Sequence, residues 1–151
     1  NLAAIDALCN IGDKILVARN CHKSVYHAIE LLGLDPIYIY PEIDEYGICK
    51  GITKEQIENI ITKETSIKAM VLVSPTYEGR VSDIEGISDV LHRNNIPLIV
   101  DCDTKSAQDI ARIYANGITS FVHRLCHKRN DAKEIVNISE QQPILCVDSI
   151  N

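Results

Sequence analysis

The segment Ala69–Val73 is an uninterrupted apolar run with the sequence Ala-Met-Val-Leu-Val. A strand that is apolar at every position has to be covered on both faces, as strands in parallel sheets usually are. Shorter runs of apolar, β-branched or aromatic residues predict three more strands, at residues 14–17, 37–40 and 97–100. We therefore expect a mostly parallel β-sheet whose strands are buried beneath helices.

Helical patterns lie between the predicted strands. Thr53 and Gln56 have the spacing of a capping box, and so do Ser82 and Glu85, so each pair predicts the start of a helix. Apolar residues at helical spacing predict further helices at 2–11, 24–33 and 104–116, and another strand is expected at 118–122. This alternation predicts a three-layer α/β fold, a mostly parallel sheet with helices on both faces.

The overall composition is that of one globular domain. The chain has 151 residues, of which 46% are hydrophobic and 24% charged, which is enough for a single buried core. A net charge of -6 without any basic stripe argues against a nucleic-acid partner. We expect a soluble, cytoplasmic protein, because there is neither a signal-peptide pattern nor an apolar run of the roughly 20 residues that a membrane span needs.

The cysteines are scattered along the chain and form no CxxC pair. This pattern favours reduced thiols over disulfides. Two of the cysteines are followed directly by histidine, but adjacent residues seldom bind one tetrahedral zinc ion with good geometry, so we expect no metal site. The residues are Cys9, Cys21, Cys49, Cys102, Cys126 and Cys146.

Polar residues suited to ligand binding follow three of the predicted strands. His22 follows the first, Ser74 and Thr76 follow the apolar run, and Asp101 follows the last. The carboxyl ends of parallel strands lie along one edge of the sheet, where ligands bind. An imidazole that stacks on a ring, a carboxylate that pairs with a ring nitrogen, and hydroxyls at the rim together suit a flat, anionic, heteroaromatic cofactor.

Simpler interpretations remain open for two of these residues. A loop histidine beside Arg19 and Lys23, as His22 is, is usually a solvated surface group. An acid directly after a strand, as Asp101 is, acts about as often as a helix N-cap as it acts on a ligand. Spacing alone does not decide between these roles.

Three segments carry a family resemblance. They are Arg-Asn-Cys-His-Lys-Ser at 19–24, Ser-Pro-Thr-Tyr-Glu-Gly at 74–79 and Ile-Pro-Leu-Ile-Val-Asp at 96–101. From Asn1 to about Asp101 the chain resembles the ornithine/lysine/arginine decarboxylase family. Its members are pyridoxal-phosphate enzymes with the aspartate aminotransferase fold, called fold type I.

The resemblance implies a role for two of the strand-end residues. His22 would stack on the ring of pyridoxal 5'-phosphate and Asp101 would pair with its pyridinium nitrogen, while Ser74 and Thr76 are expected to line the rim by their place after the strand. The family also carries a His-Lys dipeptide shortly after a strand, and His127-Lys128 is similar to it. By this resemblance Lys128 would form the internal aldimine and, together with Asp101, would be a catalytic residue.

Other features depart from the family pattern. Cys102-Asp103-Thr104 follows Asp101 without the family's histidine, and the interval to Lys128 is shorter than in the family. A phosphate-binding loop would end where this chain begins, and no segment resembles the small carboxyl-terminal domain. We therefore expect residues 1–151 to be a partial pyridoxal-phosphate-binding large domain of a longer enzyme.

The resemblance implies decarboxylation of a basic amino acid, which is lysine, arginine or ornithine, to a polyamine-type amine and carbon dioxide. One alternative is a non-catalytic fold type I homologue that acts as an interaction or regulatory subunit. The absence of the family's histidine after Asp101 would be the feature that distinguishes this homologue. Another alternative is a different fold type I enzyme, such as an aminotransferase. The resemblance also implies a homo-oligomer, a dimer or larger, with an amino-acid substrate.

Overall fold

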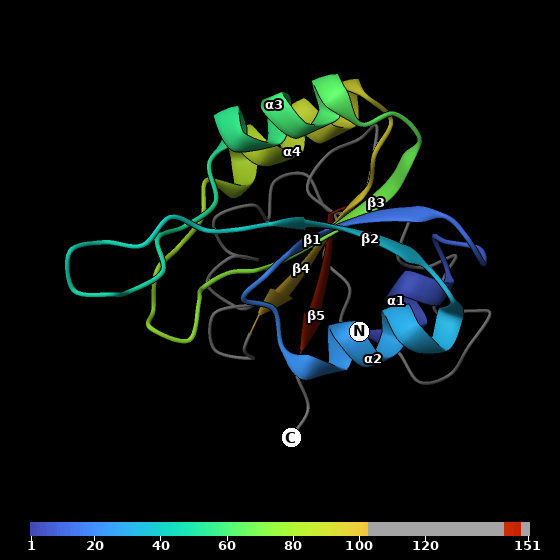
Figure 1. Cartoon of the computed structure of the whole chain (residues 1–151), viewed down its shortest axis with the longest axis horizontal. Helices are drawn as coiled ribbons and strands as arrows, with labels where there is room; N and C mark the ends of the chain where they lie inside the picture. Colours follow the sequence, from blue (N-terminus) through green and yellow to red (C-terminus); the bar gives the residue numbers. More distant parts are fainter. Residues whose placement is uncertain (103–143, 149–151) are drawn as a thin grey trace.

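The computed structural model describes residues 1–102 and 144–148, in which nine helices and strands are defined (Figure 1). In chain order they are α1 (Leu2–Asp6), β1 (Lys14–Ala18), α2 (Lys23–Leu32), β2 (Asp35–Ile39), α3 (Lys54–Lys63), β3 (Ile67–Val73), α4 (Ile84–Arg93), β4 (Leu98–Cys102) and β5 (Ile144–Asp148). The helix predicted at 104–116 and the strand predicted at 118–122 lie outside the described residues. No helix in the described part of the chain is long and apolar enough to cross a membrane.

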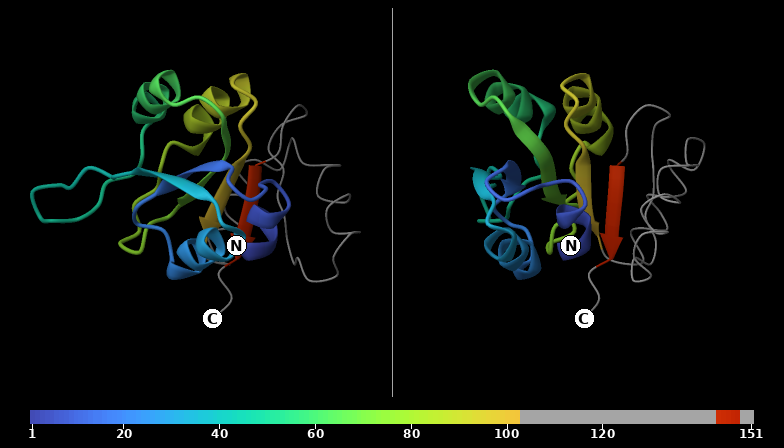
Figure 2. Two further views of the ribbon diagram at one scale, coloured as in Figure 1. Left: turned by 45° about the vertical axis from the view of Figure 1, so that its right-hand side comes forward. Right: turned by 90° about the vertical axis from the view of Figure 1, so that its right-hand side faces the viewer.

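The strands form one parallel sheet in the order β2-β1-β3-β4-β5. Helices α1 and α2 cover one face of the sheet, and α3 and α4 cover the other (Figures 1 and 2). The predicted three-layer α/β fold is therefore confirmed. From β1 the chain moves outward to β2, and from β3 it moves outward in the opposite direction to β4. Open α/β sheets bind ligands at such a change of direction, beyond the carboxyl ends of the strands.

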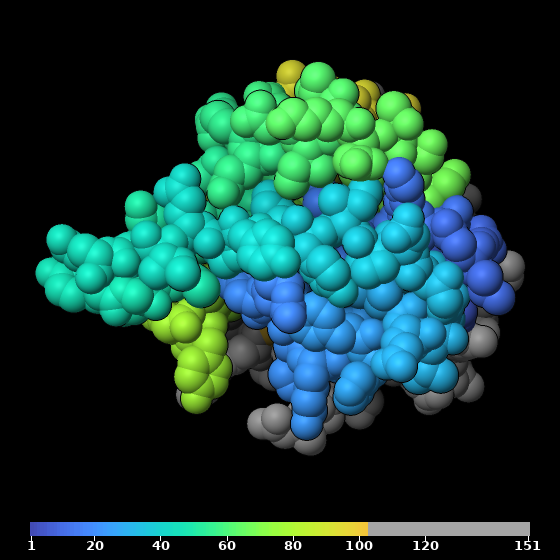
Figure 3. All heavy atoms as spheres, viewed as in Figure 1, coloured from blue at the N-terminus to red at the C-terminus, as the bar shows by residue number. Residues whose placement is uncertain are grey.

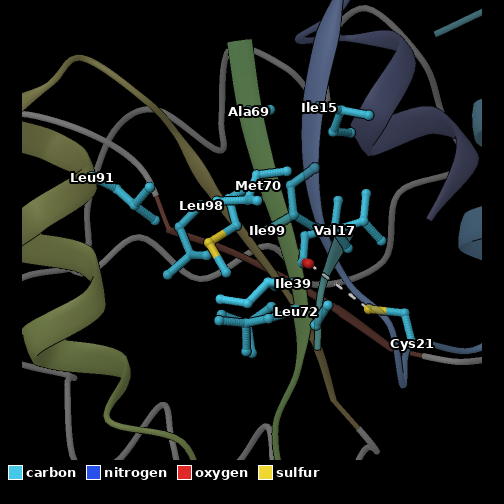
Figure 4. Close-up of a cluster of buried hydrophobic side chains, with 14 of the residues drawn as sticks. Ile15, Val17, Cys21, Ile39, Ala69, Met70, Leu72, Leu91, Leu98 and Ile99 are labelled. Atoms are coloured by element: carbon cyan, nitrogen blue, oxygen red, sulfur yellow. Dashed lines mark hydrogen bonds between the residues drawn. The ribbon is translucent and has the colours of Figure 1, made fainter. Parts of the chain in front are cut away.

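Strand β3 lies at the centre of the sheet and is buried on both faces. The side chains of Ala69, Met70, Val71 and Leu72 are fully buried, as the uninterrupted apolar run predicted. Figure 4 shows Met70 and Leu72 among side chains from the neighbouring strands, with Leu91 reaching toward them from α4. Each such Leu or Ile contributes roughly 1.5–3 kcal/mol by leaving water. This burial accounts for much of the stability of the sheet whose strand ends carry the candidate site.

Helix α3 begins at the predicted capping box. Thr53 Oγ1 accepts a hydrogen bond from the Gln56 N–H at 3.4 Å, and Gln56 Oε1 accepts one from the Thr53 N–H at 3.0 Å. These bonds satisfy N–H groups that have no partner within the helix. The sequence therefore located this helix start correctly.

The second predicted capping box is wrong. Helix α4 begins at Ile84, and its N-cap is Asp83, whose Oδ1 accepts a hydrogen bond from the Gly86 N–H at 3.0 Å. The hydroxyl of Ser82 instead accepts a hydrogen bond from the Ile52 N–H at 3.1 Å. Aspartate caps a helix as well as serine does, so this helix starts one residue later than the Ser82 box predicts.

Helix α1 is also shorter than predicted, because it ends at Asp6. A turn follows, in which the Asn10 N–H donates to Asp13 Oδ2 at 2.8 Å and the Asp13 N–H donates to the Asn10 carbonyl at 3.0 Å. Short side chains such as that of Asp13 compete in this way with helical hydrogen bonds. The helical spacing of the apolar residues beyond Asp6 therefore did not produce a helix.

Candidate functional site

The predicted ligand-binding residues gather where β1, β3 and β4 end. His22 follows β1, Ser74 follows β3 directly, and Asp101 is the penultimate residue of β4. Asp101 pairs in register with Val73, and the Ser74 N–H donates to the Asp101 carbonyl at 3.0 Å. The turn after β3 and the end of β4 are therefore adjacent, at the point where the chain changes direction.

Asp101 is completely buried, with 0% of its surface exposed. The next residue, Cys102, is still part of β4, and an N-cap residue directly precedes its helix, so Asp101 is not an N-cap. Removing a carboxylate from water costs several kcal/mol, of order 20 in the idealised limit, unless hydrogen bonds or positive charge compensate. A buried carboxylate at a strand end is therefore suited to a cationic or hydrogen-bonding ligand.

The Asp101 carboxylate has a hydrogen-bond donor in the Asn1 side chain. Asn1 Nδ2 donates to Asp101 Oδ2 at 3.0 Å and to Ser24 Oγ at 2.7 Å. Asn1 Oδ1 is buried and accepts no hydrogen bond from any residue that the structure describes. Neither Asn1 nor Ser24 was predicted from the sequence, because asparagine before a helix and serine in a first helical turn are ordinary helix-start residues.

His22 is exposed and is the N-cap of α2. Its Nδ1 accepts a hydrogen bond from the Ser24 N–H at 3.4 Å and lies 3.0 Å from Ser24 Oγ. These contacts hold one edge of the imidazole at the start of the helix. The imidazole is therefore exposed, with its Nδ1 edge turned toward Ser24.

The hydroxyls of Ser74 and Thr76 contact the loop that follows β3. Ser74 Oγ accepts a hydrogen bond from the Ser82 N–H at 3.1 Å, and Thr76 Oγ1 accepts one from the Arg80 N–H at 3.2 Å. The side chains of Ser74 and Thr76 are both buried. A hydroxyl that accepts one hydrogen bond still has its own hydrogen to donate. The role of Ser74 and Thr76 at the rim of a cofactor site stays a prediction.

An ion pair joins this loop to the long loop between β2 and α3. The Arg80 guanidinium donates to Asp44 Oδ2 at 2.9 Å. The Ile48 N–H, with the Arg80 charge as a smaller contribution, lowers the pKa of the Asp44 carboxyl. Gly51 lies so close to the same loop that a Cβ atom there would approach the Val81 carbonyl oxygen to 2.7 Å. The two loops are thus positioned together.

Cys21 directly precedes His22 in the loop between β1 and α2 and is buried. Its thiol contacts the Val71 carbonyl, with Sγ 3.8 Å from the oxygen (Figure 4). Burial, and then the nearby Asp101 charge, raises the pKa of the Cys21 thiol to about 12. Because the thiolate is the reactive form, Cys21 is an inert core residue in the native protein.

We expect Cys21 to resist iodoacetamide at pH 8 in the native protein, whereas the half-buried Cys49 reacts. Unfolding lowers the pKa of Cys21 toward the ordinary value of 9.0, so its contribution to stability is present below pH 9 and is lost as the pH rises toward about 12. Peptide mapping by mass spectrometry, with and without urea, measures this. Labelling of Cys21 at the rate of Cys49 without urea would contradict the burial.

The predicted cofactor lysine, Lys128, and its neighbour His127 lie outside the described residues. Within residues 1–102 and 144–148, no group of three or more His, Cys, Asp or Glu residues is arranged to hold a metal ion.

Several solved structures with this arrangement carry the names of aminotransferases. A PLP-bound putative aminotransferase from Clostridium difficile 630 matches with a TM-score of 0.56 and 22% identity, over 66% of this chain and 26% of that one. An alanine aminotransferase from Pyrococcus furiosus matches with a TM-score of 0.53 and 21% identity, over 66% and 25%. At these identities the likeness establishes the fold, which is that of the fold type I class.

The chain itself belongs to the Orn/Lys/Arg decarboxylase family. The model of that family's major domain matches residues 1–122, which confirms the resemblance seen in the three sequence segments. An arginine decarboxylase of Bacillus subtilis (strain 168) is 40% identical over 101 residues, which are 66% of this chain and 21% of that protein. The lysine decarboxylase LdcA of Pseudomonas aeruginosa is 35% identical over 91 residues, 52% of this chain and 12% of that protein.

One relative, named for a different reaction, matches a larger share of this chain than the arginine decarboxylase does. An O-phospho-L-seryl-tRNA:Cys-tRNA synthase of Methanococcus vannielii is 28% identical over 119 residues, 76% of this chain and 30% of that protein. Measured against the Bacillus subtilis arginine decarboxylase, the chain spans about a fifth, 21%, of the relative's length.

Proposed function

We propose that residues 1–151 are part of the pyridoxal-phosphate-binding large domain of an enzyme that decarboxylates lysine, arginine or ornithine. The observation that carries this proposal is the fully buried Asp101 carboxylate at the end of a central strand, beside the turn after β3. Membership of the Orn/Lys/Arg decarboxylase family supports the reaction type. The decarboxylases of Bacillus subtilis and Pseudomonas aeruginosa support a basic amino acid as the substrate.

The residues at the strand ends fit this cofactor. A pyridinium N–H would give the buried Asp101 carboxylate a charge-assisted hydrogen bond, which is about twice as strong as a neutral one. The carboxylate in turn favours the protonated ring. Asn1 Oδ1 is a buried acceptor to which no described residue donates, so this region has polar capacity beyond what the described protein atoms use.

Each residue of the site has one task in this proposal. Asp101 keeps the ring nitrogen protonated, the exposed His22 imidazole stacks on the ring, and Ser74 and Thr76 lie at the rim. Lys128 binds the cofactor covalently. When bound, pyridoxal phosphate supplies the electron sink for loss of a substrate's α-carboxylate.

We also propose that the full-length protein is a homo-oligomer. Large apolar side chains are exposed on the two loops that the Arg80–Asp44 ion pair joins, and exposed apolar surface of this kind often marks protein contacts when it is contiguous. The loop between β2 and α3 projects from the body of the molecule (Figure 3). Light scattering of the full-length protein measures the assembly. The exposed residues are Ile43, Tyr46, Tyr77 and Val81.

Carbon dioxide release tests the proposed reaction. Full-length protein is incubated with pyridoxal phosphate and, separately, with lysine, arginine and ornithine labelled in the carboxyl carbon. Release of labelled carbon dioxide from one of them is the expected result. Transamination without gas would indicate another fold type I activity, that of an aminotransferase. A protein that takes up no cofactor and releases no carbon dioxide would be the non-catalytic homologue.

A further inference from the structure

Asn1 occupies a helix N-cap position but does not cap the helix. Asparagine is favoured there because its side-chain oxygen accepts a hydrogen bond from an N–H of the first turn. Asn1 makes no such bond to α1. Its carboxamide instead reaches two residues that are 23 and 100 positions away in the sequence. The side chain is therefore used for a contact between distant parts of the fold.

The orientation of the Asn1 carboxamide follows from its partners. A carboxylate only accepts hydrogen bonds, so the atom that faces Asp101 Oδ2 at 3.0 Å has to be the amide nitrogen. The second hydrogen of this nitrogen is directed to Ser24 Oγ, 2.7 Å away. One amide group thus joins the end of β4 to the first turn of α2.

Ser24 continues the contact to His22. The Ser24 hydroxyl accepts from Asn1 and keeps one hydrogen, and its oxygen lies 3.0 Å from His22 Nδ1. The Ser24 N–H also points at His22 Nδ1, at 3.4 Å, and an N–H can only donate. In this geometry Nδ1 is the acceptor for Ser24, and a neutral ring that accepts at Nδ1 carries its hydrogen on Nε2.

We propose that Asn1 and Ser24 are positioning residues that join Asp101 and His22 into one hydrogen-bonded unit. The inference rests on the proposed function, in which Asp101 and His22 contact the same cofactor ring. Asn1 supplies a donor to a carboxylate that would otherwise lose this hydrogen bond in a buried site, and Ser24 sets which nitrogen of His22 carries the hydrogen. Both would act through Asp101 and His22 and not on the reacting atoms themselves.

The test uses the full-length protein and the variants Asn1→Ala, Asn1→Asp and Ser24→Ala. Asn10→Ala is the matched control, because Asn10 is exposed in the turn after α1. Three quantities are measured: the dissociation constant for pyridoxal phosphate by equilibrium dialysis, the pH midpoint of the visible absorbance of the bound cofactor, and kcat and KM separately. The melting temperature of each cofactor-free variant checks folding.

Asn1→Ala is expected to lower kcat about tenfold, or about 1.4 kcal/mol, with KM changed less than about twofold. The pH midpoint of the bound cofactor shifts in the same variant. Asn1→Asp has a larger effect, because it places a second carboxylate against Asp101. Ser24→Ala moves kcat and the midpoint in the same direction as Asn1→Ala, and Asn10→Ala moves neither.

A double-mutant cycle separates positioning from unrelated structural effects. In an Asp101→Asn background, Asn1→Ala is expected to cause little further loss, because the two residues act as one unit. Additive losses would overturn the inference, and so would an Asn1→Ala protein that matches Asn10→Ala in kcat and pH midpoint. Wild-type protein that takes up no pyridoxal phosphate would overturn the proposed function as well, so the two failures are distinguishable.

Discussion

Replacing Asp101 by asparagine is expected to reduce kcat by about a hundredfold to a thousandfold. The carboxylate is fully buried, and without its charge the ring nitrogen is no longer kept protonated, which weakens the electron sink in the transition state. At about 1.4 kcal/mol for each factor of ten, the expected loss corresponds to about 2.7–4.1 kcal/mol. Asparagine is almost isosteric with aspartate, so this variant removes the charge and leaves the packing around β4. The measurement is kcat for carbon dioxide release by full-length protein.

Cofactor binding is expected to change much less than turnover in Asp101→Asn. The ring would still stack on His22 and the rest of the cofactor would keep its other contacts, so the dissociation constant rises about tenfold or less. Asp89→Asn on the exposed side of α4 is the matched control and leaves both quantities unchanged. Equal losses in turnover and cofactor affinity would contradict the role of Asp101 as the partner of the ring nitrogen.

Leu98→Ala is expected to lower the free energy of unfolding by about 2–5 kcal/mol. Leu98 is fully buried at the start of β4 and pairs in register with Met70 on β3. Truncation removes apolar burial and leaves a cavity, because tightly packed neighbours collapse only partly into the space. The urea midpoint of the full-length protein, with the slope of the transition, measures the loss.

Leu31→Ala is the control for this substitution. Leu31 is 75% exposed on α2, and alanine is at least as good a helix former as leucine, so its effect is expected to stay within about 0.5 kcal/mol. A Leu98→Ala protein as stable as Leu31→Ala would contradict the central position of β4 in the core.

The fold was predictable because its sheet is buried on both faces. A strand buried on both faces does not alternate between apolar and polar residues, so the apolar run Ala69–Val73 is recognisable as such a strand. The capping box at Thr53 marks a helix start by local hydrogen bonds alone. The start of α4 was not predictable in the same way. Ser82 and Asp83 are both good caps, and the choice depends on Ser82 bonding to Ile52, 30 residues away.

The candidate site was predictable only in part, because it too depends on contacts between residues far apart in the sequence. His22 and Asp101 stand out because polar residues after apolar runs end up at the carboxyl edge of a parallel sheet. Asn1 gave no such signal, since its position before a helix already explains an asparagine. Its contact with Asp101 joins residues 100 positions apart and exists only after the sheet has formed.

Borohydride reduction shows whether the full-length protein holds pyridoxal phosphate as an aldimine on Lys128. Full-length protein is incubated with pyridoxal phosphate, reduced, digested and mapped by mass spectrometry, with protein reduced before cofactor addition as the control. We expect a visible absorbance band that reduction abolishes and a single pyridoxyl label on Lys128. A protein that shows no absorbance band and carries no label on any lysine would contradict it.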